Sequence, residues 1–318
     1  VHKLGQLAGP EELLHHGPAV AAMGPGVARA ADIAEARSMT YWLSGPDPAL
    51  VAASGFDLAV VDYSRDGSGA RALSPEDVAL MKRKPDGGRR IVLAYLSIGE
   101  AEDYRYYWKP AWSRKPPSWL EAENPDWAGN YKVRFWHEDW QRLIFGGPGA
   151  YLDRIIDFGF DGVYLDIVDA YWYFQEKGRK TAEAEMVAFV RALARHARSR
   201  EPGFLIVPQN AEDLLANEAY RRTIDAQAKE DLFFGLVGPD PPNARDSFDW
   251  AKKHLDLARA AGKPVLLVEY PETAANIARV YEKGRAAGYL PYATVRALDR
   301  MTVNAGFDPP VPDLLLRD

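Results

Sequence analysis

The chain has 318 residues, of which 47% are hydrophobic and 26% charged, and its formal net charge at pH 7 is −6. This composition is typical of a globular protein with a large core, and the acidic balance disfavours a nucleic-acid partner, which would require a basic face. The absence of cysteine excludes disulfides, thiolate zinc sites and cysteine nucleophiles. No apolar run reaches the length that a membrane-spanning helix requires.

The first 38 residues are rich in alanine, glycine and proline. They contain no apolar stretch preceded by basic residues that would form an intact signal peptide. We therefore predict a leader or a poorly ordered arm over residues 1–38 and a single domain over residues 39–318.

From Thr40 onward, short apolar runs alternate with amphipathic helical patterns. The runs cover residues 40–44, 58–63, 91–97, 162–166, 204–209, 226–234, 264–270 and 290–295. The helical spacing of apolar residues is clearest over 181–200, and Ser74-Pro75 is a typical helix start. Strands that alternate with helices form a parallel sheet, and eight such units predict an α/β fold, the (β/α)8 TIM barrel.

A long insertion, residues 98–161, separates the third and fourth predicted strands. It contains six of the nine tryptophans: Trp108, Trp112, Trp119, Trp127, Trp136 and Trp140. A long loop of this kind is usually functional or folded onto the body of the protein. One interpretation is a satellite hydrophobic cluster that holds the loop in place. The other is a sugar-stacking platform, for which Trp108, Trp136 and Trp172 are the candidates.

Polar and ionisable side chains stand at or just after the ends of seven predicted strands. They are Asp62 and Tyr63, then Ser97 with Glu100 and Glu102, Asp166 with Asp169, Gln209 and Asn210, Glu230 and Asp231, Glu269 and Tyr270, and Arg296 with Asp299. The loops after the strands form the active face of a TIM barrel, so these residues predict a site there. Asp166 ends an apolar run, where a carboxylate is costly unless the strand opens into a polar site. A helix cap or a structural ion pair explains one isolated aspartate equally well.

Clustered carboxylates point to three kinds of function. The first is glycoside hydrolysis, in which one carboxylic acid protonates the leaving oxygen and a second carboxylate acts as nucleophile or base. The second is an enolase-type magnesium reaction, which also needs a basic residue. The only such residue at a strand end is Lys229, and its alternation with Glu230 directs it to the opposite face. The third is a polysaccharide-binding barrel without activity. The Gly67–Ala72 segment matches a dinucleotide-binding pattern, but neither a helix nor an acidic strand end follows at the required spacing.

Four segments resemble glycoside hydrolase family 114. They are AYLSIGEAEDYRYYW at 94–108, GFDGVYLDIVDAY at 159–171, PQNAEDLL at 208–215 and EDLFF at 230–234. The resemblance extends over roughly residues 40–300. This family comprises the endo-α-1,4-polygalactosaminidases and bacterial relatives once labelled cysteinyl-tRNA-synthetase-related, a label that no nucleotide-binding motif or basic face supports here.

The resemblance implies a TIM barrel that hydrolyses α-1,4-linked, galactosamine-containing polysaccharide with retention of configuration. It implies that Asp166 is the nucleophile and that Glu230 is the acid/base. It also implies a substrate groove lined by Asp62, Tyr95, Glu100, Arg105, Asp169, Asn210 and Tyr270. The strand-end argument adds Tyr63, Ser97, Gln209 and Glu269 to the substrate-binding residues, and the aromatic argument adds Trp136 and Trp172. Glu269 stands where the resemblance leads us to expect aspartate.

These predictions define the expected partners. We expect an oligosaccharide or polysaccharide substrate, in which cationic amino sugars would suit the acidic chain. We expect neither a metal nor another cofactor, no nucleic acid, and a monomer. An enzyme that degrades polysaccharide is expected to be secreted or to reside in the cell envelope, with a cytoplasmic location left open. The catalytic and the purely binding alternatives differ in whether Asp166 and Glu230 lie within reach of one glycosidic bond.

Overall fold

The computed structural model describes residues 32–312. Most of the expected leader, residues 1–31, lies outside the described residues, as do residues 313–318. The part of the leader that is described contains a 3-10 helix, η1 (Ile33–Glu35), in which Ile33 is buried against the core. In the part of the chain that the structure describes, no helix is long and apolar enough to cross a membrane.

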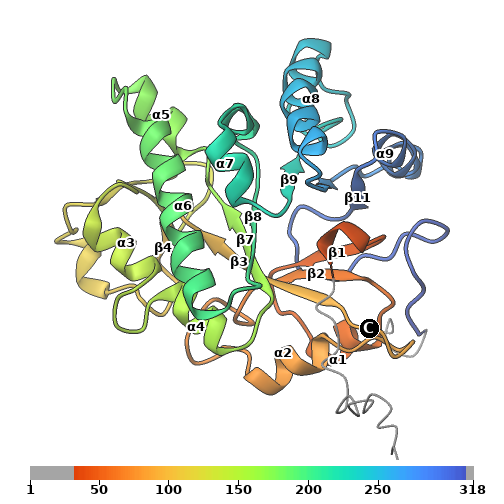
Figure 1. Cartoon of the computed structure of the whole chain (residues 1–318), viewed down its shortest axis with the longest axis horizontal. Coiled ribbons are helices and arrows are strands. Elements are labelled where there is room, and N and C mark those ends of the chain that lie inside the picture. The colour runs from red at the N-terminus through yellow and green to blue at the C-terminus, as the bar shows by residue number, and fades with distance from the viewer. Residues whose placement is uncertain (1–31, 313–318) are drawn as a thin grey trace, which may run out of the picture. The chain divides into compact units, whose positions relative to one another are not determined.

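Eight parallel strands form the centre of the molecule (Figure 1). The first sheet has the order β1 (Met39–Trp42), β2 (Leu58–Val61), β3 (Ile91–Ser97), β7 (Gly162–Asp166) and β8 (Leu205–Pro208). The second has the order β9 (Gln227–Glu230), β10 (Val265–Glu269) and β11 (Leu290–Ala293). Most of these strands are apolar and buried, as expected when both faces of a parallel sheet are covered. The exception is β9, whose sequence is Gln-Ala-Lys-Glu and whose last two residues are only partly buried.

The two sheets adjoin at both sides. A parallel bridge between Gln209 and Ala228 joins β8 to β9, and the hydroxyls of Thr40 on β1 and Tyr292 on β11 are hydrogen bonded at 3.1 Å. The order of the strands is that of the predicted α/β barrel. Within residues 32–312, however, no continuous ladder of backbone hydrogen bonds closes β11 onto β1.

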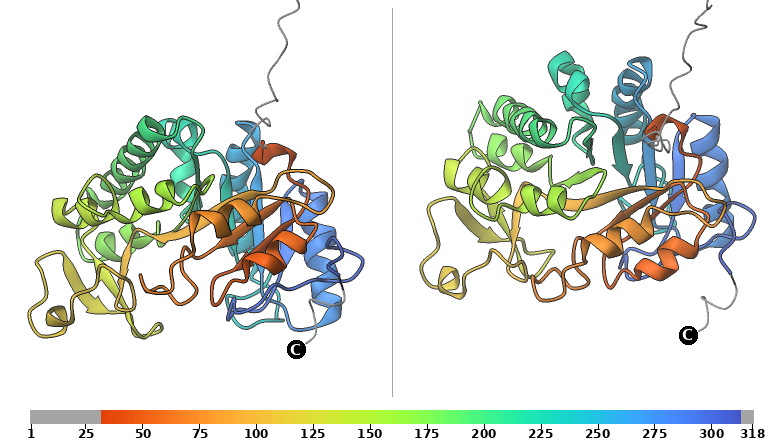
Figure 2. Two further views of the ribbon diagram at one scale, coloured as in Figure 1. Left: turned by 90° about the horizontal axis from the view of Figure 1, so that it is seen from below. Right: turned by 60° about the horizontal axis from the view of Figure 1, so that its bottom comes forward.

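Helices lie outside the strands and follow most of them (Figures 1 and 2). They are α1 (Pro48–Ala53), α2 (Pro75–Met81), α5 (Ala170–Glu176), α6 (Ala182–Arg200), α7 (Glu218–Thr223), α8 (Arg245–Ala260) and α9 (Ala274–Ala286), with the 3-10 helix η3 (Glu212–Ala216) before α7. The predicted start of α2 is confirmed, because Ser74 and Asp77 form a reciprocal capping box around Pro75. The predicted apolar face of α6 is buried, including Met186, Phe189 and Val190.

The insertion after β3 is not the long loop that the sequence predicts. It forms a small antiparallel sheet of order β4 (Glu100–Glu102), β6 (Asn130–Val133) and β5 (Leu120–Glu123), a 3-10 helix η2 (Pro110–Ser113), and the helices α3 (Glu138–Ile144) and α4 (Tyr151–Asp157). The sheet lies to one side of the barrel strands, in yellow in Figure 2. Trp112, Trp119 and Trp140 pack on one another with ring centroids 5.0 and 5.1 Å apart, as in a satellite cluster.

One strand is shorter than predicted. The run 226–234 was expected to be a single strand, but β9 ends at Glu230. Asp231 adopts the left-handed region at φ 53°, which turns the chain out of the sheet. The buried Glu269 carboxylate then accepts the backbone N–H groups of Leu232, Phe233 and Phe234, so these apolar residues pack in a turn and not in a strand.

Candidate active site

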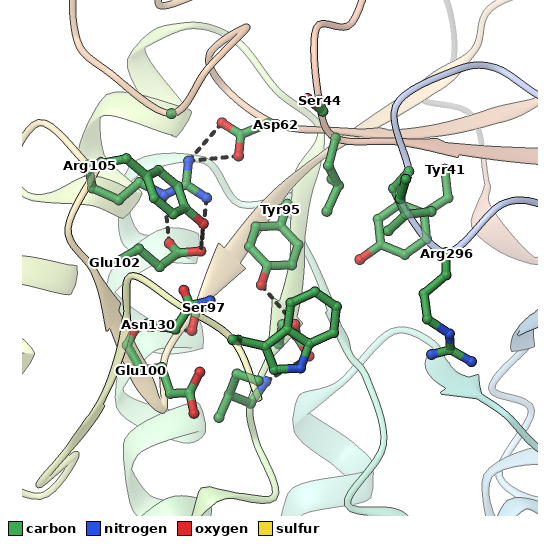
Figure 3. Close-up of a pocket in the computed structure, with 18 of the residues that line it drawn as sticks. Tyr41, Ser44, Asp62, Tyr95, Ser97, Glu100, Glu102, Arg105, Asn130 and Arg296 are labelled. Carbon is green, nitrogen blue, oxygen red and sulfur yellow. Dashed lines mark hydrogen bonds and ion pairs between the residues drawn. The ribbon is translucent and has the colours of Figure 1, made fainter. Parts of the chain in front are cut away.

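A cavity of about 470 Å³ opens at the carboxyl ends of the strands (Figure 3). Ten of the predicted site residues line it: Asp62, Tyr95, Ser97, Glu100, Arg105, Asp166, Asp169, Asn210, Glu230 and Tyr270. They come from strand ends that are far apart in the sequence. The barrel order of the strands brings them together, because parallel strands end at the same edge.

Asp166 and Glu230 are bridged by a single side chain. Asp166 ends β7, Glu230 ends β9, and Gln209 follows β8 between them. The Gln209 Nε2 donates to Asp166 Oδ1 at 2.9 Å and to Glu230 Oε2 at 2.7 Å. The distance between two oxygens that accept from the same nitrogen cannot exceed the sum of the two hydrogen-bond lengths. These two oxygens therefore lie within about 5.6 Å of each other.

The two carboxyl groups differ in the groups that surround them. Asp166 accepts hydrogen bonds from the Tyr95 hydroxyl at 2.7 Å and the Ile167 backbone N–H at 2.8 Å, in addition to Gln209. Burial raises the pKa of Asp166, and these three donors oppose the rise by stabilising its anion. Burial, followed by the charge of Asp166, raises the pKa of Glu230 to about 8. The Tyr270 hydroxyl donates a hydrogen bond to Glu230 and opposes this rise. Asp166 therefore ionises more readily than Glu230.

Three strand ends in a row carry a residue in left-handed backbone geometry. Ile167 has φ 55°, Asn210 has φ 55° and Asp231 has φ 53°, and each directly follows Asp166, Gln209 or Glu230. Such a conformation is unfavourable for residues with a Cβ atom, above all for β-branched isoleucine. It turns the chain sharply after each strand and leaves the side chains of Asp166 and Glu230 at the cavity, with Gln209 directly behind them. Strain repeated at three neighbouring strand ends is typical of a functional site.

A close approach of two loops also depends on Gly99. A Cβ atom at this position would lie 2.1 Å from the carbonyl oxygen of Ile167, so only glycine fits between the end of β3 and the end of β7. This contact fixes the loop that carries Glu100, whose carboxylate accepts from Asn124 at 2.8 Å and pairs with Lys132 at 3.4 Å.

One wall of the cavity is a buried ion network centred on Arg105 (Figure 3). Its guanidinium donates to both carboxylate oxygens of Asp62 at 2.7 and 2.8 Å and to Glu102 at 2.6 Å. The side chains of Arg105, Asp62 and Glu102 are 1, 7 and 4% exposed. Burial raises the pKa of Asp62 to about 6, although the Arg105 charge opposes it. Two carboxylates share one cation, so this wall is electronegative whenever both are ionised.

Comparison with known proteins identifies the family. The model of glycoside-hydrolase family GH114 matches residues 25–306. The chain belongs to this family. It is 38% identical over 284 residues to an uncharacterised protein of Thermotoga maritima, covering 85% of this chain and 84% of that protein. It is 39% identical over 252 residues to one of Deinococcus radiodurans, covering 79% and 77%.

Two solved structures share the fold. The glycoside hydrolase domain of PelA from Pseudomonas aeruginosa has a TM-score of 0.64 at 23% identity, covering 84% of this chain and 98% of that chain. Ega3 of Aspergillus fumigatus, solved in complex with galactosamine, has a TM-score of 0.63 at 19% identity, covering 88% and 100%. The GH114 match and the α/β barrel architecture agree with the family and fold predicted from the sequence. The protein is thus a glycoside hydrolase.

Five predicted site residues do not line the cavity of this GH114 enzyme. Gln209 lies directly behind Asp166 and Glu230, as described above. Tyr63 is fully buried and donates to the Gly67 carbonyl, and the buried Glu269 holds the turn after β9. The tryptophan platform was misplaced. Trp136 packs on Phe174 and under the Arg179 guanidinium, and Trp172 donates to Asp213, so both rings are engaged elsewhere.

Other residues that line the cavity of the GH114 enzyme were not among the site residues predicted from the sequence. Trp127, from the insertion, lines it and is 55% exposed, whereas the Trp108 ring packs on Tyr131 and does not line it. Tyr41 also lines the cavity; it lies inside the first predicted strand and not at its end, so the strand-end pattern did not select it. Arg296 also lines the cavity, pairs with Asp231 at 2.7 Å and lies over the Tyr270 ring at 4.3 Å. Its position after the last strand is the sequence feature that could have identified it. Among residues 32–312, no group of three or more His, Asp or Glu is arranged to hold a metal ion.

Proposed function

We propose that this glycoside hydrolase cleaves α-1,4-linked galactosamine-containing polysaccharide with retention of configuration, using Asp166 as nucleophile and Glu230 as acid/base. The observation that carries the proposal is the Gln209 amide that bridges the two carboxyl groups. A purely binding barrel has no need to hold two buried carboxyl groups so close together, because their mutual repulsion is costly.

The separation of the two groups supports retention. Retaining glycosidases place their carboxyl groups about 5–5.5 Å apart, whereas inverting enzymes need about 6.5–9.5 Å to admit a water molecule. The bridged oxygens of Asp166 and Glu230 lie within about 5.6 Å of each other. The first step is then attack of an Asp166 oxygen on the anomeric carbon, while Glu230 gives its proton to the departing glycosidic oxygen. Glu230 next removes a proton from water, which attacks the anomeric carbon and releases Asp166.

The environments of the two residues support this division of roles. A nucleophile must be ionised, and three hydrogen-bond donors stabilise the Asp166 anion. A general acid must carry its proton at working pH, and a pKa of about 8 keeps Glu230 protonated at neutral pH. Loss of the negative charge from Asp166 on forming the glycosyl-enzyme lowers the pKa of Glu230, which then suits its second role as a base.

The charge of the cavity supports a cationic amino sugar as the substrate. Seven carboxylates line its walls: Asp62, Asp66, Glu100, Glu102, Asp166, Asp169 and Glu230. The cations that line it are Arg65, Arg105 and Arg296. This excess of negative charge attracts the ammonium groups of a deacetylated amino sugar. Ega3, which shares the fold, was solved with galactosamine. A second cavity of about 520 Å³ shares Tyr270 and Arg296 with the first, which provides room for a polymer longer than one unit.

The test is incubation with defined α-1,4-linked galactosamine oligomers, with products identified by mass spectrometry. The anomer formed first, followed by proton NMR, should be α if configuration is retained. Release of the β anomer would refute the double-displacement mechanism. Absence of cleavage of galactosamine oligomers together with cleavage of neutral α-linked oligomers would refute the proposed substrate. Three further predictions are untested: a leader or poorly ordered arm over residues 1–38, a monomeric state, and a secreted or cell-envelope location with a cytoplasmic one left open. Limited proteolysis, sedimentation and cell fractionation test them in turn.

A further inference from the structure

One carboxylate in the cavity has no partner. Six of the seven carboxylates that line it accept hydrogen bonds from other residues: Asp62, Asp66, Glu100, Glu102, Asp166 and Glu230. Among residues 32–312, no other residue donates a hydrogen bond to the carboxylate of the seventh, Asp169, or forms an ion pair with it; only its own backbone N–H faces this carboxylate. This carboxylate is therefore the one whose hydrogen-bonding capacity the protein leaves open to a bound molecule.

Two groups near Asp169 could be its partners, the N-terminal backbone N–H groups of α5 and the ammonium group of Lys229, but it bonds to neither. It is the residue before α5, where a side chain commonly caps the helix, but it makes no cap hydrogen bond. The charge of Lys229 on β9 acts on Asp169, but its ammonium group is held by Glu212 at 3.2 Å and by the Asn210 side chain at 3.4 Å. Asp166 and Glu212 add negative charge around Asp169. The surroundings of this carboxylate thus favour an incoming cation.

We propose that Asp169 binds the ammonium group at C2 of the amino sugar whose glycosidic bond is cleaved, and so selects free amines over acetylated ones. This inference rests on the proposed function. C2 is bonded to the anomeric carbon that Asp166 attacks, and Asp169 follows Asp166 by three residues at the same end of β7. Asp166 and Asp169 both line the cavity, so we expect a C2 substituent to lie on the side that Asp169 forms.

The chemistry of the reaction gives this contact a catalytic consequence. The transition state places positive charge on the anomeric carbon, next to the positive C2 ammonium, and the two charges repel. A carboxylate that faces the ammonium offsets this repulsion in the transition state. An uncharged acetamido group can donate one neutral N–H to Asp169, which is a weaker interaction, and would leave its carboxylate without a charged partner.

Protonation provides an additional readout. Burial, followed by the charge of Asp166, raises the pKa of Asp169 to about 7, with Lys229 opposing and Glu212 reinforcing the rise. A bound ammonium favours the ionised carboxylate and lowers this pKa. Binding of galactosamine near neutral pH should therefore release a proton from Asp169, which calorimetry in buffers of different ionisation enthalpy can detect.

The experiment compares Asp169→Asn with Glu176→Gln. Glu176 is the last residue of α5, the helix that Asp169 precedes. It is exposed and outside the cavity walls, so this control removes the same charge without altering the site. Initial rates are measured on galactosamine oligomers and on the same oligomers after N-acetylation. For Asp169→Asn we expect kcat/KM on the free amine to fall about 10- to 100-fold, the range for loss of a charged hydrogen bond, with little change on the acetylated oligomer. Asp169→Glu should restore part of the preference.

A binding measurement separates this inference from the proposed function. Titration of wild-type protein with galactosamine and with galactose should show preference for the amine, and Asp169→Asn should lose most of this preference. Retention of the full preference in that variant, or an equal loss of kcat/KM on both oligomers, would overturn the role of Asp169. Should wild-type protein cleave no oligomer, the proposed hydrolysis fails, while the two titrations still decide whether Asp169 recognises the ammonium group.

Discussion

The charge of Asp166 should hold the proton on Glu230, and Asp166→Asn tests this coupling directly. The bridged oxygens of the two residues lie within about 5.6 Å of each other. With an effective dielectric constant of about 20, two like charges at this separation repel by about 3 kcal/mol, which corresponds to about 2 pKa units. We therefore expect the pKa of Glu230 to fall from about 8 to about 6 in Asp166→Asn. It should stay above the ordinary glutamate value, because burial is the larger cause of its rise.

The assay is a carbon-13 NMR titration of the glutamate carboxyl groups, which does not require an active enzyme. Glu230→Gln identifies the signal, and Glu176→Gln serves as the control for loss of a remote charge. Thermal unfolding of Asp166→Asn at pH 9, where both groups of the wild-type pair are ionised, should show a higher melting temperature because the repulsion is gone. A change of less than half a unit in the pKa of Glu230 would show that the two carboxyl groups do not form a coupled pair.

Three other predictions concern the cavity. The kcat/KM of the wild-type enzyme should fall above about pH 8, since the general acid Glu230 loses its proton there; in Tyr270→Phe this limit should move to higher pH, because the Tyr270 hydroxyl lowers the pKa of Glu230. The kcat/KM of Glu230→Gln should fall by several orders of magnitude on the polymer but far less on an aryl glycoside, whose acidic leaving group needs no protonation. Equal losses of kcat/KM on both substrates would contradict the role of Glu230 as general acid. Trp127→Ala should raise KM several-fold with little change in kcat, as expected for loss of stacking on an exposed ring, and an unchanged KM would exclude this ring from the substrate groove.

Local sequence was sufficient to locate the strands and to place Asp166 and Glu230 among the polar residues at strand ends. Parallel strands buried on both faces read as continuous apolar runs, so β3 and β7 were predicted with their observed bounds. The polar residues that interrupt these runs mark the strand ends, which is why Asp166 and Glu230 stood out. The end of β9 could not be read in this way. The apolar residues after Glu230 continue the pattern, and only the Glu269 carboxylate, contributed by the next strand, turns them away.

The contacts within the site were decided by tertiary structure. Gln209 and Asn210 are adjacent in sequence and equally polar, yet only Gln209 bridges the two carboxyl groups. The pairing of Arg105 with Asp62 joins residues 43 positions apart and depends on how the insertion folds against the barrel. The same dependence explains why Trp127 lines the cavity whereas Trp136, from the same insertion, does not. The direction of a ring in an insertion is set by the surfaces against which it packs.

Sequence by itself therefore determined which residues could do the chemistry, because hydrophobic burial fixes where strands begin and end along the chain. Tertiary structure alone decided which of these residues meet. Distance, burial and the pKa of each carboxyl group arise from neighbours on other strands, and no local pattern encodes those neighbours. Asp169 illustrates the difference: its position at a strand end is visible in the sequence, but its lack of a partner is a property of the folded cavity.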